Sequence, residues 1–344
     1  MTQVNVGIVP MNQPVNENAS VVPATHYTLL LLPDFSMIAF AGLIEPMRLA
    51  NRVSGKSLYS WTLVSVDGQA VMASNGVPVS PGADIASLRS PGNIIVCGGI
   101  NGDRFVDSGT FAWLRRAAAM GSEIGATCTG SFVLARAGVL AGYRCTVHWE
   151  HLASWPEIFP DIEVTGELFT VDRKRATCAG GTASTDMMLD RIASSHGEEL
   201  ATMVSEQMLH HKIRPGSVLQ NSLVQLPLGV EREDLRAAIS CMLDNLEAPL
   251  DLQTLSTRIG KSRRNLERIF RKYLNCSPAK YYLGLRLVRA QQLLHQTQLP
   301  VVQVALSCGF ISTTHFSKCY REYFGLTPKA DKSYRQIRRT SHAA

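Results

Sequence analysis

The sequence predicts two folds in succession: an α/β domain with a doubly wound, mostly parallel sheet, and then an all-α domain with two helix-turn-helix units. Three observations lead to this prediction. Residues 25–196 alternate short apolar strand patterns with amphipathic helix patterns, which is typical of β-α-β units. Residues 249–344 contain two pairs of helical patterns, each with a glycine in its turn. Most of the positive charge also lies in that second region.

Charge divides the chain into two regions of opposite sign. The whole chain has 34 lysine and arginine residues and 28 aspartate and glutamate residues, of which 17 basic and four acidic ones lie in residues 249–344. That region therefore carries about +13, and the remaining 248 residues carry about −7. A basic module joined to an acidic body predicts a polyanionic partner for one part of the chain. We expect DNA, because neutralising phosphates releases counterions.

Length and composition limit the class of protein. A chain of 344 residues with 45% hydrophobic and 18% charged residues is expected to form two or three globular domains. No apolar run reaches the ~18–20 residues that cross a bilayer, and the N-terminus lacks the layout of a signal peptide. None of the eight cysteines forms a C-x-x-C pair. We therefore expect free thiols in the cytoplasm, with no membrane association, metal or cofactor.

The first domain is expected to begin with an apolar strand and a helix that starts at Ser36. The run Asn93–Cys97 is typical of a strand buried on both faces, and a Ser74-Asn75-Gly76 turn interrupts the strand pattern of residues 71–79. Ligand sites in such sheets lie at the carboxyl ends of the strands. Strands are predicted at 26–32, 58–66, 71–79, 93–97 and 123–126, and helices at 36–53, 106–120 and 197–211.

The second domain is expected to consist of helices alone, after a connection rich in proline and glycine. Ser262 and Ser312 are expected to cap the helices that follow the two turns. Helices are predicted at 231–246, 251–259, 263–274, 278–295, 301–307 and 313–324. The expected boundaries are a polar leader at 1–24, a first domain at 25–210, a linker at 211–230, a second domain at 231–335 and a basic tail at 336–344.

The second helix of each pair has an apolar face and a polar face. In a helix-turn-helix unit that helix enters the major groove of DNA. A helical bundle with solvated basic faces is the alternative, but two copies joined by one helix favour DNA binding. The residues expected to contact base edges or phosphates are Arg263, Arg264, Asn265, Arg268, Thr313, Thr314, His315 and Lys318. Those expected to hold phosphates alone are Lys272, Lys280 and Arg321.

Three stretches of the second domain carry recognisable motifs: Leu255–Phe270 in the first unit, and Val304–Phe310 and Phe324–Pro328 in the second. With them, about 85 residues closely resemble the AraC/XylS family of bacterial transcription regulators. The family's final Tyr-Arg pair usually follows the proline closely, whereas Tyr334-Arg335 lies several residues later here. The resemblance implies binding to promoter DNA and contact with RNA polymerase, and it makes a homodimer plausible.

Three strings of the first domain carry recognisable motifs: Ile124–Ala135, which contains Cys128, Thr146–Trp149 and Thr177–Gly181. With them, residues 25–210 resemble the PfpI, or class I glutamine amidotransferase-like, fold. The resemblance places Cys128 at the tight strand-to-helix elbow of that fold. This fold joined to an AraC-type module defines the GlxA-like regulators. The resemblance implies an activator that responds to an amine- or amino-acid-like metabolite, of the arginine, carnitine or glycine betaine type.

The elbow leaves two interpretations open. An enzyme would use Cys128 as a nucleophile with His148 and Glu45 as its partners, as a hydrolase or a glyoxalase-type enzyme. Proteolytic relatives place histidine directly after the cysteine, where this chain has Thr129. A sensor would use the same elbow to hold a ligand without covalent chemistry, and fusion to a DNA-binding module favours this second interpretation. The expected ligand-binding residues are Phe35, Glu45, Gly99, Cys128, Thr129, His148 and Trp149, with no catalytic residue.

Two further patterns predict no separate site. The loop Gly98–Gly102 lacks the lysine of a Walker motif and the spacing of a dinucleotide fingerprint, so it is expected to border the ligand pocket. His210-His211 lacks nearby metal ligands, so a position at the exposed end of a helix is expected instead of a zinc site. The sequence alone names neither the effector nor the target promoter.

Overall fold

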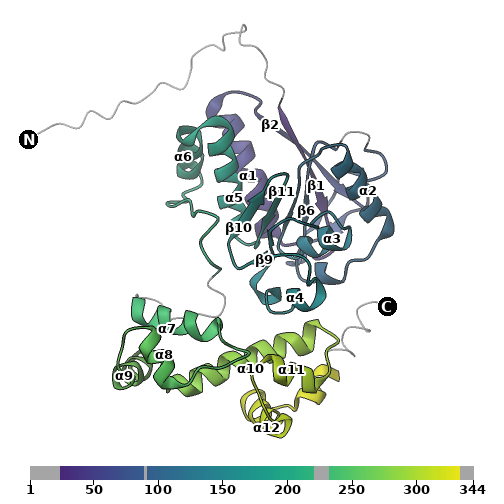
Figure 1. Cartoon of the computed structure of the whole chain (residues 1–344). Helices are drawn as coiled ribbons and strands as arrows, with labels where there is room; N and C mark the ends of the chain where they lie inside the picture. Colours follow the sequence, from purple (N-terminus) through teal and green to yellow (C-terminus); the bar gives the residue numbers. More distant parts are fainter. Residues whose placement is uncertain (1–23, 89–90, 221–231, 334–344) are drawn as a thin grey trace, which may run out of the picture. The chain divides into compact units, whose positions relative to one another are not determined.

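The structure, a computed structural model, describes residues 24–88, 91–220 and 232–333 (Figure 1). By their contacts these residues form two units, one within 1–130 and 180–215 and the other within 131–179 and 216–344. The expected basic tail, almost all of the expected leader and about half of the expected linker lie outside the described residues. The domain boundaries expected from the sequence remain a prediction.

The first region is built on a seven-stranded sheet with the order β10-β11-β7-β6-β1-β2-β5. The pairs β1–β2, β1–β6, β6–β7 and β2–β5 are parallel, and β10–β11 is antiparallel. This confirms the predicted doubly wound, mostly parallel sheet. Leu29 to Leu32 are almost completely buried, as expected for a strand covered on both faces. The strands are β1 (Thr25–Leu31), β2 (Tyr59–Ser65), β5 (Ala83–Asp84), β6 (Asn93–Cys97), β7 (Ile124–Thr127), β10 (Phe169–Asp172) and β11 (Arg175–Cys178).

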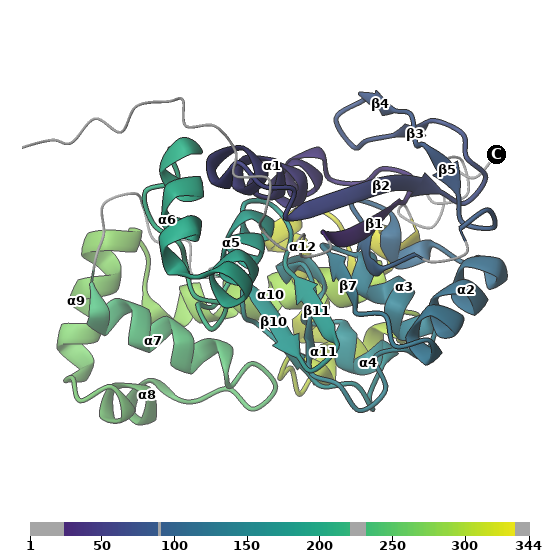
Figure 2. The same cartoon turned by 90° about the horizontal axis from the view of Figure 1, so that it is seen from above.

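Helices cover the faces of this sheet. Figures 1 and 2 show α1 (Met37–Ser54), α5 (Ala183–His196) and α6 (Glu198–Gln207) packed together on one face, with α2 (Ser108–Ala119) on the other. Ser36, the first residue of the predicted helix, is the cap of α1, since its side chain accepts a hydrogen bond from the amide of Ala39. Because helices cover both faces of the sheet, the carboxyl ends of β1, β6 and β7 are left at its edge.

Several short elements complete the first region. The predicted strand at 71–79 forms the hairpin of β3 (Val71–Met72) and β4 (Pro78–Val79), with the predicted turn between them. The sequence patterns predicted neither α5 nor the hairpin β10–β11. In α5, Ser184, Thr185 and Asp186 are all buried, so the helix shows no clear apolar stripe. The other elements are α3 (Gly130–Arg136), α4 (Trp155–Ile158), β8 (Cys145–Thr146), β9 (Val164–Thr165) and the 3-10 turns η1 (Gly102–Arg104) and η2 (Trp149–His151).

The second region is helical, as predicted. Three helices begin and end at the predicted residues. We call the second helix of each helix-turn-helix unit, α9 or α12, its reading helix. Ser262 and Ser312 cap the two reading helices as expected, each accepting a hydrogen bond from the amide three residues later. The predicted helix at 231–246 is shorter, and residue 231 lies outside the described part. The helices are α7 (Glu233–Leu243), α8 (Leu252–Arg258), α9 (Arg263–Leu274), α10 (Pro278–Gln296), α11 (Val301–Ser307) and α12 (Thr313–Phe324).

Each helix-turn-helix unit has its own core, and α10 contributes to both. Leu266, Ile269 and Phe270 of α9 pack with α7, α8 and the first half of α10. Phe316 and Tyr320 of α12 pack with α11 and the second half of α10. Burial of these apolar faces holds α9 and α12 on one scaffold and leaves their polar faces free.

Candidate functional site

Cys128 lies in the turn between β7 and α3, at the carboxyl end of a central strand. Its φ of 57° is in the left-handed region, which is costly for a residue with a side chain. Such strain collects at functional sites, and ligand sites of doubly wound sheets lie at this edge. The residue is 9% exposed. The structure therefore contains the strained elbow that the resemblance implied.

A glycine loop lies directly against this elbow. A Cβ on Gly98 would stand 2.2 Å from the amide nitrogen of Gly130, and one on Gly99 would stand 1.8 Å from the carbonyl oxygen of Asp34. The hydroxyl of Thr129 donates a hydrogen bond of 2.6 Å to the carbonyl of Gly99. Gly99, Cys128 and Thr129 are thus brought together, and the loop predicted to border the pocket covers the start of α3.

Two polar residues that sequence reasoning missed stand beside the same loop. Asp34 follows β1 with a φ of 58°, and its carboxylate accepts a hydrogen bond of 2.7 Å from the side-chain amide of Asn101. The amide of Ile100 donates to the carbonyl of Asp34. Aspartate after a strand-ending proline was the available sequence signal, because aspartate tolerates the left-handed conformation.

Glu45 and Phe35 have partners of their own. The carboxylate of Glu45 accepts hydrogen bonds of 2.9 and 2.6 Å from Arg48, and this ion pair is about half exposed. Glu45 also lies eight residues beyond the first residue of α1, roughly 12 Å along the helix. Phe35 is fully buried, and its ring packs edge-on against Phe40 at 5.4 Å. Phe35 belongs to the core because its ring has no exposed face, and the expected ligand-binding roles of both residues stay predictions.

His148 and Trp149 are adjacent in space as well as in sequence. Their ring centroids are 5.6 Å apart, and Nδ1 of His148 lies 3.8 Å from the carboxylate of Glu150. Burial lowers the pKa of His148, and the Glu150 carboxylate opposes part of that shift. The imidazole is therefore expected to be neutral near pH 7, a form that can accept a proton or a hydrogen bond.

Asp186 and His210 form an ion cluster that the sequence did not indicate. Asp186 is fully buried in α5 and binds both His210 and Arg214. The histidine pair expected at an exposed helix end therefore has one member turned toward a buried carboxylate. No local pattern announces a contact between residues 24 and 28 positions apart.

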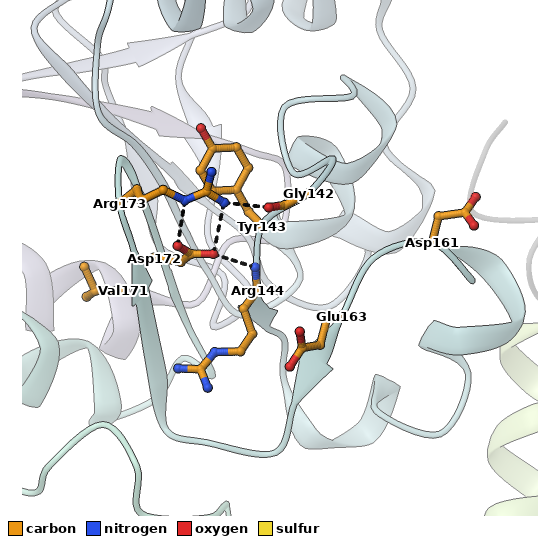
Figure 3. A pocket seen from close by; sticks show the side chains of 8 residues that line it. All are labelled: Gly142, Tyr143, Arg144, Asp161, Glu163, Val171, Asp172 and Arg173. Atoms are coloured by element: carbon orange, nitrogen blue, oxygen red, sulfur yellow. Dashed lines mark hydrogen bonds and ion pairs between the residues drawn. The ribbon is translucent and has the colours of Figure 1, made fainter.

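A hollow lies around the turn between β10 and β11 (Figure 3). Its volume is about 540 Å³. Arg173 stacks on the ring of Tyr143 at 3.9 Å and donates to Asp172, and these hydrogen bonds lower the pKa of the Asp172 carboxyl. The residues that line this hollow are mostly charged, unlike the apolar lining of most small-molecule sites. The lining residues are Gly142, Tyr143, Arg144, Asp161, Glu163, Val171, Asp172 and Arg173.

The expected DNA-contacting residues lie on the polar faces of α9 and α12, except for Lys280, which is exposed in the first turn of α10. On α9, Arg263 forms an ion pair of 3.1 Å with Glu267, and Arg268 donates a hydrogen bond of 2.9 Å to the side-chain oxygen of Asn265. Arg264 has no recorded partner among the described residues. Its guanidinium is therefore free to form a bidentate contact with a base edge.

Among the described residues, no group of three or more histidine, cysteine, aspartate or glutamate side chains could hold a metal ion. None of the helices described is both long and apolar enough to span a bilayer.

Two protein families match different parts of the chain. Residues 35–194 match the DJ-1/PfpI family, and residues 255–335 match a family described as a helix-turn-helix domain. The first match contains the Cys128 elbow, and the second contains both reading helices. The order of the two domains is the one that the sequence resemblances implied.

Two relatives match most of this chain over most of their own length. The transcriptional regulator GbdR of Pseudomonas aeruginosa is 46% identical over 303 residues, which cover 88% of this chain and 83% of GbdR. The regulator CdhR of the same organism is 43% identical over 307 residues, covering 89% of this chain and 91% of CdhR. A solved structure of an AraC family transcriptional regulator from Pseudomonas putida is 30% identical, with a TM-score of 0.50, and covers 54% of this chain and all of that one.

Proposed function

This chain belongs to the AraC family of transcription regulators, in the group whose first domain is of the DJ-1/PfpI type. From that premise we propose that it is a sequence-specific activator. Its α9 and α12 enter successive major grooves on one face of promoter DNA, about 34 Å apart. A small amine- or amino-acid-like metabolite, of the arginine, carnitine or glycine betaine type, controls it from the first domain.

The observation that carries the proposal is the pair of reading helices on one shared scaffold. Both helices are serine-capped, both bury one aromatic-rich face in a separate core, and α10 belongs to both cores. Their opposite faces keep basic and hydrogen-bonding side chains exposed. Two helix-turn-helix units with exposed basic faces on one scaffold favour a nucleic-acid partner.

DNA fragments selected from genomic DNA by the intact protein test the DNA-binding proposal. In gel-shift titrations at one salt concentration, Arg264→Ala and Lys318→Ala should each weaken specific binding by about 1–3 kcal/mol. Lys56→Ala is the matched control, because Lys56 is exposed in the first domain. Equal affinity of all four proteins would remove the assignment of these faces.

For the effector we propose a noncovalent site at the elbow, formed by Gly99, Cys128 and Thr129. Support comes from the strained turn and from the position of Cys128 at a strand end. Glu45 can contribute only if a ligand displaces Arg48 from it.

A thermal-shift screen of amino acids, betaines and polyamines tests the effector class. A ligand at 100 times its Kd stabilises the folded state by about 2.7 kcal/mol, which raises the Tm by roughly 5–10 °C in a domain of this size. Cys128→Ala should keep both this shift and ligand-dependent transcription. A screen in which no compound of these classes shifts the Tm would count against the proposal.

The second candidate function is a cysteine-dependent hydrolase or glyoxalase-type enzyme, and the positive φ of Cys128 is the observation that favours it. Turnover of an amide or aldehyde substrate that disappears in Cys128→Ala would establish it. We place this second because Cys128 is almost buried and Thr129 is tied to Gly99.

We also propose that the protein forms a homodimer and contacts RNA polymerase. The apolar side chains of Val302, Leu306 and Ile311 support a protein contact, since each is more than half exposed beside α12. Light scattering on the purified chain tests the homodimer by giving its oligomeric state.

A double variant, Val302→Ser with Leu306→Ser, tests the contact with RNA polymerase. It should lower transcription in vitro without changing DNA affinity, whereas Gln303→Ser should leave both unchanged.

A further inference from the structure

Asp186 holds the chain segment that leaves the first domain. One carboxylate oxygen accepts a hydrogen bond of 2.9 Å from Nε2 of His210 and one of 2.8 Å from the backbone amide of Arg214. The other oxygen accepts hydrogen bonds of 2.9 and 2.5 Å from Nε and Nη2 of Arg214. A fully buried carboxylate is costly unless it is paired, so both partners are needed to keep Asp186 where it is.

The chain turns back after α6 to reach this carboxylate. Leu209 takes a φ of 54°, which ends the helix, and the amide of His210 donates 2.9 Å to the carbonyl of Ser205. The hydroxyl of Ser205 donates to the carbonyl of His210 at 2.5 Å. This turn brings residues 210–214 against α5 just before the segment that connects to the helical region. The predicted helix at 197–211 therefore ends early, at Gln207, because Leu209 leaves the helical conformation.

The other end of this cluster lies against the elbow. A Cβ on Gly180 would stand 2.8 Å from the Cβ of Cys128, so the two residues are in contact. The carbonyl of Gly180 accepts from the amide of Ala183 at the start of α5. Nη2 of Arg214 donates 2.7 Å to the hydroxyl of Thr182, between these two residues. Arg214 therefore binds both the loop that contacts Cys128 and the carboxylate one turn further along α5.

We propose that this cluster couples the elbow to the connecting segment. A group that occupies the space at Cys128 displaces Gly180, weakens the contacts of Arg214 with Thr182 and Asp186, and releases residues 210–215. Asp186 and Arg214 are then positioning residues that transmit occupancy of the elbow. The inference rests on the proposed function only in taking the elbow as the effector site.

Two measurements on the ligand-free, full-length protein test the coupling. The first is the rate at which iodoacetamide alkylates Cys128, relative to the half-buried Cys241 in the helical region. The second is the rate of tryptic cleavage after the exposed Lys212, since Pro215 prevents cleavage after Arg214. Asp186→Asn and Arg214→Gln should each raise both rates about tenfold, which corresponds to losing roughly 1.4 kcal/mol of charged hydrogen bonding.

Glu123→Gln is the matched control. It breaks a similar part-buried ion pair, with Arg191 at 2.5 Å, that has no contact with the connecting segment. We expect neither rate to rise by more than twofold in this variant. If it raises both rates as much as the Asp186 variant does, the cause is general loosening of the domain and the proposal is wrong.

A reciprocal experiment uses the alkylated protein, because coupling between two sites must act in both directions. Alkylation of Cys128 should speed cleavage after Lys212 by a similar factor, compared with Cys128→Ser treated with the same reagent. Faster cleavage in the Asp186 variant with unchanged alkylation of Cys128 would overturn the coupling. If Asp186→Asn does not fold, Arg214→Gln decides the matter. No effector or DNA is used, so failure to find a metabolite leaves these results intact.

Discussion

Individual glycines decide how closely the backbone can approach itself at the elbow. Gly98 and Gly99 follow β6 and lie against Gly130 and Asp34, at distances that leave no room for a methyl group. The close approach allows Thr129 to reach the carbonyl of Gly99. Glycine is needed here because of space and not because of backbone conformation, since neither residue has a positive φ.

Gly99→Ala tests this close approach. Its Cβ would meet a backbone oxygen, which cannot rotate away, so we expect a loss of about 3 kcal/mol or more in the free energy of unfolding. Gly82→Ala is the control, because the nearest atom to its Cβ would be 3.8 Å away. Urea unfolding should show less than about 0.5 kcal/mol of change there. Similar losses in the two variants would contradict the packing described.

His148 provides a prediction about pH. Its folded pKa lies below the ordinary value of 6.5, so the unfolded chain binds more protons between those two values. Stability should therefore fall as the pH is lowered through 6.5, until the folded pKa is reached. His148→Gln should make this fall shallower. The measurement is urea unfolding of both proteins at pH steps from about 7 to about 5, and parallel curves would refute the prediction.

At the scale of elements, the two reading helices were predictable because their signals are local. Each begins after a serine cap and continues with apolar side chains at helical spacing, and both signals depend on neighbouring residues only. Helix α5 was not predictable in the same way. Its buried residues include Ser184, Thr185 and Asp186, whose burial is explained only by distant partners such as Arg214.

The caps of α9 and α12 give a prediction at this scale. Ser262→Ala or Ser312→Ala should cost about 1 kcal/mol of stability, because an amide in the first turn loses its hydrogen-bond acceptor. The glycine variants at the same positions should cost only a few tenths of a kcal/mol. Thermal unfolding followed by circular dichroism gives the values. Alanine variants as stable as the unaltered protein would show that the serine side chains do not act as caps.

At the scale of the whole molecule, the two reading helices carry unequal charge. Helix α9 has five basic residues, Arg263, Arg264, Arg268, Arg271 and Lys272, whereas α12 has Lys318 and Arg321. Because each phosphate contact adds to the salt dependence of binding, α9 should supply most of the nonspecific affinity. Helix α12, with Thr313, Thr314 and His315, is better suited to hydrogen bonding with bases.

Salt dependence of DNA binding measures this division. Log affinity plotted against log salt should lose about 0.9 from its slope in Lys272→Ala, because one phosphate contact is removed. Thr314→Ala should keep the slope and reduce the preference for the specific fragment over unrelated DNA. Fluorescence anisotropy at several salt concentrations supplies both quantities. A lower slope in the threonine variant alone would reverse the assignment.

Local sequence determined the fold class, the strands β1, β2 and β6, and the helices from α8 to α12, whereas the position of the elbow came from the resemblance to the PfpI fold. Hydrophobic periodicity, caps and turn residues act over a few neighbouring positions, so they can be recognised in one chain. Tertiary structure alone decided that Phe35 is core, that Glu45 pairs with Arg48, that Gly98 and Gly99 cover the elbow, and that Asp186 holds Arg214. The last two join residues about 30 positions apart, and such contacts exist only because the packed sheet and helices bring those residues together.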